Sequence, residues 1–208
     1  MVIPGAGRVG RTNALLILAA LVLVVADLIV YGVLLRSQGG PPPDSAAIVP
    51  FVSGYMLLMA VVLALTLGGH PFLVTMRPAM LAATAAGLLL LGFFALFSVG
   101  LPLFVAGILA AITGLRAALA GRSLRNALLV EGAAALIAVT LLVGGFEVAQ
   151  RIILCPSSGT MGGSSSGFLT GSYHYQCVNG TLTTYSGDCN GVTGGTDANG
   201  NPISSNGC

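Results

Sequence analysis

The sequence predicts an all-α integral membrane protein, a bundle of about five transmembrane helices followed by a tail rich in Gly, Ser, Thr and Asn. Two observations support this class. The 208 residues are 55% hydrophobic and 7% charged, with a mean hydropathy of +0.96, whereas about a quarter of the residues in a soluble domain are charged. The four cysteines all lie in the tail, at Cys155, Cys177, Cys189 and Cys208. We therefore expect lipid to surround most of the chain, with a disulfide-linked segment after it.

The longest uncharged stretch is residues 78–115, which contain no Asp, Glu, Lys or Arg. As one helix, these residues would extend roughly 57 Å, about twice the thickness of a hydrocarbon core of about 30 Å. Gly100 and Pro102 interrupt the stretch, and proline suits the first turn of a new helix. The stretch is therefore predicted to form two crossings, at residues 79–98 and 102–118.

Three more apolar stretches complete the predicted transmembrane domain of residues 13–146, at residues 13–35, 48–67 and 126–146. Prolines 41–43 and the sequence Gly68-Gly69-His70-Pro71 separate the first three crossings, because these residues stop helices. Residues 1–12 are a short basic lead. The apolar core of a cleaved signal peptide is usually 7 to 15 residues long; this one is longer, so we expect it to be retained as the first crossing.

The arginines predict the orientation, because basic residues near short loops stay on the cytoplasmic side. All eight basic residues are Arg, as is typical of a GC-rich bacterial gene. With five crossings, six share one face and two the other: Arg8, Arg11, Arg77, Arg116, Arg122 and Arg125 against Arg36 and Arg151. This predicts a multi-pass protein of the cytoplasmic (inner) membrane, with its N-terminus inside and its tail extracytoplasmic.

The tail, residues 147–208, has an even number of cysteines in one segment, which is typical of two disulfides in an oxidising compartment. A zinc site is disfavoured because the cysteines are spaced too widely. The sequence leaves the three possible pairings open. Residues 172–178, Asn179-Gly180 and residues 181–185 predict a β-hairpin in which Cys177 faces Leu182 and Tyr175 faces Thr184. Residues 159–167 are predicted to be a flexible linker.

Two carboxylates lie within predicted crossings, where an ionised group is costly unless it is paired, hydrated or protonated. Asp27 is predicted to lie roughly 12 Å from the outer end of its helix and Glu131 roughly 8 Å from the inner end of its own. Their depths differ by about 10 Å in a core of about 30 Å, so they are candidate stations of a proton path rather than one pair. The alternatives are contacts to a partner, or structural contacts of Asp27 with Tyr31 or Thr84 and of Glu131 with Arg122 or Arg125.

Other patterns carry less weight. Gly5-Ala6-Gly7-Arg8-Val9-Gly10 matches a dinucleotide fingerprint, but no strand precedes it. Small residues recur four apart, a spacing that lets membrane helices approach closely, in Ala60-Ala64-Gly68, Ala79-Ala83-Gly87 and Ala106-Ala110-Gly114. We identify no catalytic residues, no metal ligands, no cofactor-binding residues and no basic face for nucleic acid.

These observations favour a non-enzymatic accessory, assembly or interaction subunit of a cell-envelope complex. Its expected partners are the lipid bilayer and other membrane or envelope proteins. The alternative is a small transporter or channel subunit that uses Asp27 and Glu131.

Overall fold

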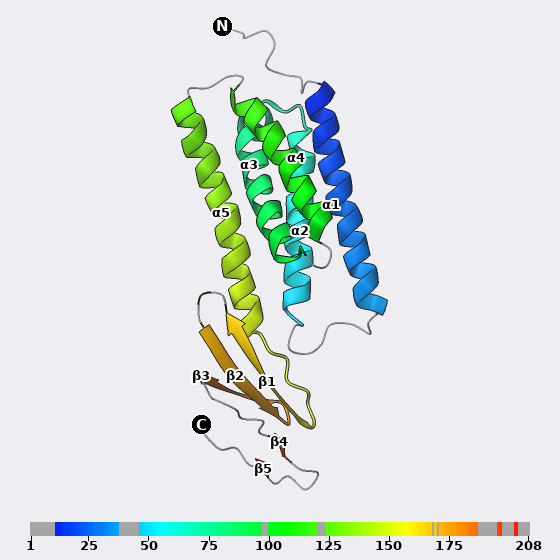
Figure 1. Ribbon diagram of the computed structural model, residues 1–208, viewed down its shortest axis with the longest axis vertical. Helices are drawn as coiled ribbons and strands as arrows, with labels where there is room; N and C mark the ends of the chain where they lie inside the picture. The colour runs from blue at the N-terminus through cyan, green and yellow to red at the C-terminus, as the bar shows by residue number, and fades with distance from the viewer. Residues whose placement is uncertain are drawn as a thin grey trace. The chain divides into compact units, whose positions relative to one another are not determined.

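The computed structural model describes residues 11–37, 46–96, 100–119, 124–167, 169, 171–186, 195–196 and 202–203. Five long apolar helices form a bundle in this part of the chain (Figure 1): α1 (Arg11–Ser37), α2 (Ile48–Thr66), α3 (Pro71–Phe94), α4 (Gly100–Leu119) and α5 (Leu124–Arg151). Each is long and apolar enough to cross a membrane. The predicted fold class is confirmed. The basic lead before Arg11, the residues Cys189 and Cys208, and the side chains of Arg122 and Arg125 lie outside the described part.

Helix α3 begins at Pro71, eight residues before the predicted start of the third crossing at Ala79. Proline at the first helical position leaves no donor unsatisfied, so Pro71 starts the helix and Pro78 lies buried inside it. The Arg77 guanidinium donates to the carbonyl oxygens of Thr66, at 2.8 Å, and Gly68, at 3.0 Å. Arg77 thus satisfies carbonyls at the C-terminal end of α2, which otherwise lack partners.

Two glycines let α3 and α4 pack closely. A Cβ atom on Gly92 of α3 would lie 2.6 Å from the backbone nitrogen of Phe104, and one on Gly107 of α4 would lie 2.9 Å from that of Leu89. Between the helices, the N–H of Gly100 donates to the carbonyl oxygen of Ala95 at 2.8 Å. The predicted helical hairpin is therefore formed, and its backbones approach too closely for larger side chains at these positions.

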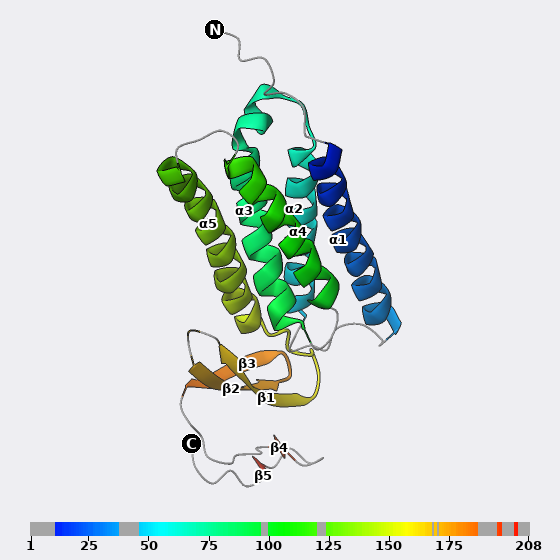
Figure 2. The ribbon, with the colours of Figure 1, turned by 45° about the horizontal axis from the view of Figure 1, so that its top comes forward.

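Helix α1 packs against α4 through one face (Figure 2). Its buried residues are spaced three or four apart, as one side of a helix requires: Ile17, Ala20, Val24 and Asp27. Of the three small-residue rows, the one on α4 is buried throughout, at Ala106, Ala110 and Gly114, whereas Ala64 in the row on α2 is exposed. Only the α4 row thus lies wholly inside the bundle.

Tyr55 of α2 connects two other helices. Its hydroxyl donates to the carbonyl oxygen of Ala138 in α5 at 3.0 Å. Its ring lies over Gly87 of α3, where a Cβ atom would collide with the hydroxyl. Lipid offers no hydrogen-bond partners, so the buried Tyr55 hydroxyl needs a partner from the protein, and the Ala138 carbonyl oxygen provides it.

The tail contains an antiparallel sheet of three strands in the order β1 (Thr160–Gly167), β2 (Gly171–Val178) and β3 (Thr181–Ser186). The short strands β4 (Gly195–Thr196) and β5 (Pro202–Ile203) form a second antiparallel pair. Cys177 faces Leu182 and Tyr175 faces Thr184. Asn179 and Gly180 both have positive φ, 46° and 83°, as a type I′ turn requires. The predicted hairpin and its register are confirmed.

The predicted linker at residues 159–167 is wrong, because residues 160–167 form β1 and pair with β2. Its Gly and Ser composition resembles a flexible segment, yet Gly163 lies opposite Tyr175 in the ladder. A Cβ atom on Gly163 would lie 2.6 Å from the Tyr175 hydroxyl oxygen, so the ring covers the glycine. An aromatic ring over a strand glycine supplies packing that the glycine itself lacks.

We predict that Gly92→Val weakens the α3–α4 hairpin, because the new side chain would displace the Phe104 backbone. Overpacking of this kind costs about 1–3 kcal/mol, which thermal unfolding in detergent will detect. Gly132→Val on α5 is the matched control, since a Cβ there meets nothing within 4 Å. Equal melting temperatures of the two variants would contradict the close approach.

Candidate functional site

Asp27 is the more deeply buried of the two predicted intramembrane carboxylates. It is 4% exposed, and its Oδ2 atom has no hydrogen-bond partner. Tyr31, one turn later on α1, is half-buried. Thr84 does not supply the expected contact, because its hydroxyl donates to the carbonyl oxygen of Met80 at 2.8 Å in its own helix. Asp27 is therefore a buried polar group with capacity to accept a hydrogen bond.

Glu131 lies on α5 and is half-buried, with an Oε1 atom that has no hydrogen-bond partner. Helices α1 and α5 lie on opposite edges of the helical bundle in both views (Figures 1 and 2). The structure thus places Asp27 and Tyr31 on one helix and does not bring Glu131 beside them.

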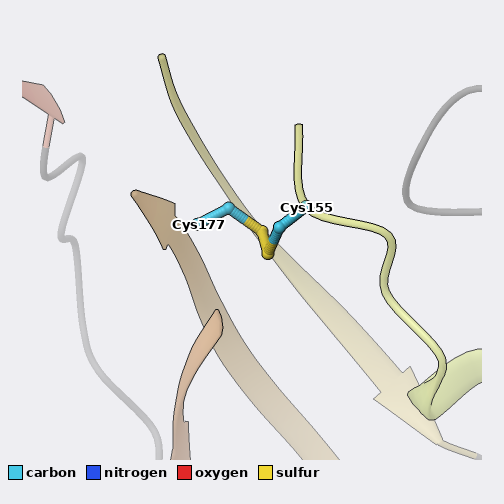
Figure 3. The surroundings of a disulfide bond; sticks show 2 residues. All are labelled: Cys155 and Cys177. Carbon is cyan, nitrogen blue, oxygen red and sulfur yellow. A yellow bond between two sulfur atoms is a disulfide. The ribbon is translucent and has the colours of Figure 1, made fainter. Parts of the chain in front are cut away.

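The chain divides into two compact units, and the second contains residues 41–51 and 143–208. In it, a disulfide joins Cys155, in the segment after α5, to Cys177 of β2 (Figure 3). Cys177 is buried together with Tyr175 and Ile153 in a small core. The pairing that the sequence left open is therefore settled for these two cysteines. If both predicted disulfides form, the remaining pair is Cys189 with Cys208.

The end of α5 makes two hydrogen bonds to the sheet region that the sequence analysis missed. Glu147, which is 9% exposed, accepts a hydrogen bond at Oε2 from the backbone N–H of Leu169 at 3.3 Å. The Tyr173 hydroxyl donates to the carbonyl oxygen of Gln150 at 2.5 Å. The sequence signal for this contact was Glu147, an acidic residue close to the end of the fifth crossing. The predicted domain boundary assigned this residue to the tail.

These contacts run in the same order along two segments of the chain, residues 147–155 and residues 169–177. Residue 147 meets residue 169, residue 150 meets residue 173, and residue 155 meets residue 177. Alternate residues of a strand point to one face, so Tyr173, Tyr175 and Cys177 share a face of β2. Strand β2 therefore runs alongside the last turn of α5 and the segment that follows it.

Among the described residues, no group of three or more His, Cys, Asp or Glu side chains could hold a metal ion. Near the end of α5, the Glu147 side chain accepts a hydrogen bond from the Leu169 N–H, whereas Gln150 Oε1 is buried without a hydrogen-bond partner.

We predict that Tyr173→Phe loosens the sheet, because it removes the bond to the Gln150 carbonyl. A lost hydrogen bond of this kind costs about 1 kcal/mol, which corresponds to roughly fivefold more frequent opening of the tail. Hydrogen–deuterium exchange of residues 171–186 in detergent will measure this opening. Tyr31→Phe, the same chemical change on α1, should leave exchange in the tail unchanged; equal effects of both variants would contradict the assignment.

No protein-family model, no curated protein and no solved structure matches this chain. Its role is therefore inferred from its own residues.

Proposed function

We propose that this protein is a non-enzymatic accessory, assembly or interaction subunit of a cell-envelope complex. In this proposal, it presents its sheet on the extracytoplasmic side of the cytoplasmic membrane. The observation that carries the proposal is the attachment of the sheet to α5. A disulfide, a buried acidic side chain and a tyrosine hydroxyl all connect β2 or the turn before it to the chain that leaves the membrane. A presented surface needs such a fixed position, because ordering a flexible tail on binding weakens affinity.

The proposed orientation draws on the number of spans. An odd number of crossings puts the two ends of the chain on opposite sides of the membrane. With five spans, six of the eight arginines lie on the same side as the N-terminus. This excess favours a cytoplasmic position for that side. The Cys155–Cys177 disulfide supports an oxidising compartment for the tail.

A second candidate function is supported by Asp27. A carboxylate inside a span often marks a proton or ion pathway, and Asp27 has an Oδ2 atom that is buried without a partner. In a transporter or channel subunit, Asp27 would bind the proton or cation and Glu131 would act as a separate station. We favour the interaction role because the two carboxylates lie on helices at opposite edges of the bundle.

We predict that an epitope placed after Cys208 is labelled by an impermeant reagent on intact cells. The same epitope placed before Met1 should be labelled only after permeabilisation. These two tagged proteins test the orientation directly. A C-terminal epitope that stays unlabelled until the membrane is opened would overturn the proposed display of the sheet.

We predict that Asp27→Asn and Glu131→Gln leave the proteins that co-purify in mild detergent unchanged. Both substitutions keep the side-chain shape and remove the charge, so only a role for the charge itself would be lost. Proton uptake by vesicles that contain the purified chain provides the second measurement. Uptake by the native chain that either substitution abolishes would favour the transporter, and isolation of the native chain only as a monomer would count against the interaction role.

A further inference from the structure

We propose that the turn between β1 and β2 inserts Leu169 into the lipid interface beside the C-terminal end of α5, where it anchors the sheet to the bilayer surface. The inference requires α5 to span the membrane. It holds whichever side the tail faces and whatever partner the protein has, so it stands apart from the proposed function.

The depth of the turn follows from the length of α5. The helix is continuous from Leu124 to Arg151, with Arg125 in its first turn. From Arg125 to Glu147 it rises roughly 33 Å, against about 30 Å for a hydrocarbon core. With the first turn of α5 at the edge of the hydrocarbon on one side, Glu147 lies at the opposite edge, and Arg151 lies about 6 Å farther out.

Leu169 lies beside Glu147, because its backbone N–H donates to Glu147 Oε2 at 3.3 Å. Its side chain is 69% exposed. Val148, next to Glu147 on the helix, is 62% exposed. At this depth the surroundings of an exposed side chain are lipid and headgroups, so we infer that the exposed Leu169 side chain meets them.

Glu147 makes this position tolerable for the backbone of the turn. Non-helical backbone near the hydrocarbon needs a hydrogen-bond partner from the protein, since lipid supplies none. Glu147 is buried and provides such an acceptor to the N–H of Leu169. An acidic residue near the end of a membrane span thereby gains a specific role.

The sequence around the turn fits an interfacial anchor. Phe168 and Leu169 are adjacent large apolar residues between Gly167 and Gly171, in a tail otherwise rich in Gly, Ser, Thr and Asn; Phe168 lies outside the described residues. Tyr173, two residues into β2, belongs to a type enriched at membrane interfaces. Burying large apolar side chains at the headgroup boundary is the usual basis of interfacial attachment.

Tryptophan fluorescence tests this proposal, because the chain contains no Trp. The full chain carrying Leu169→Trp is reconstituted into phosphatidylcholine and phosphatidylglycerol vesicles, with or without lipids brominated near the start of the acyl chain. Leu182→Trp is the matched control, since Leu182 is also exposed but faces Cys177, near the other end of β2. Mass spectrometry without reduction verifies that both variants keep the Cys155–Cys177 disulfide.

The expected result is blue-shifted emission at position 169 and loss of most of its intensity with brominated lipid. The expected emission at position 182 is that of a water-exposed Trp, with little quenching by lipid. Equal quenching at both positions, or quenching at neither, would overturn the proposal.

A second measurement avoids an introduced Trp, because Trp itself favours interfaces. A lipid with a photoactivatable group near the start of its acyl chain should label a peptide containing residues 167–171 of the native protein. Leu169→Ser should lose most of this labelling while the disulfide remains. Absence of label from this peptide, or equal labelling of both proteins, would rule the anchor out.

Discussion

The close approach of α3 and α4 is the constraint on which the helical bundle depends. Gly92 and Gly107 each bring a backbone where a Cβ atom would otherwise lie. This contact makes one long apolar stretch into two antiparallel crossings. The hairpin therefore brings the number of candidate spans to five, and the proposed orientation depends on that odd number.

Lipid as a solvent accounts for most of the polar contacts in the bundle. The Thr66, Thr84 and Thr113 hydroxyls each donate to a carbonyl oxygen of their own helix. Tyr55 donates to a carbonyl oxygen of α5, and Arg77 donates to the carbonyl oxygens of Thr66 in α2 and of Gly68 just after it. Hydrogen-bond donors for a buried carboxylate are scarce, because the backbone N–H groups of a helix in lipid are already bonded within the helix. This shortage explains why Asp27 retains an unpartnered oxygen while the hydroxyls do not.

The sequence predicted most of the fold because its strongest signals are local. Helix length, glycine and proline breaks, and the Asn179-Gly180 turn each depend on a few neighbouring residues. The failures involve residues distant in sequence. The strand at residues 160–167 pairs with β2, where Tyr175 covers Gly163, and the Arg77 side chain donates to the carbonyl oxygen of Thr66, eleven residues earlier. Of the candidate site, the burial of Asp27 in a span was predictable, whereas the contact of Glu147 with Leu169 spans 22 residues.

The face of β2 that carries Tyr173, Tyr175 and Cys177 explains how so polar a tail becomes ordered. A Gly- and Ser-rich segment buries little apolar surface to offset its conformational entropy. Three contacts act on alternate residues of β2: the bond from Tyr173 to Gln150, the buried ring of Tyr175 and the disulfide at Cys177. Together they hold one face of the strand in place. Closing a loop of about this length with a disulfide contributes about 3 kcal/mol in the chain-entropy account. The sheet is therefore ordered chiefly by its attachment to the segment that leaves α5, and the end of α5 is part of the folded tail rather than only its tether.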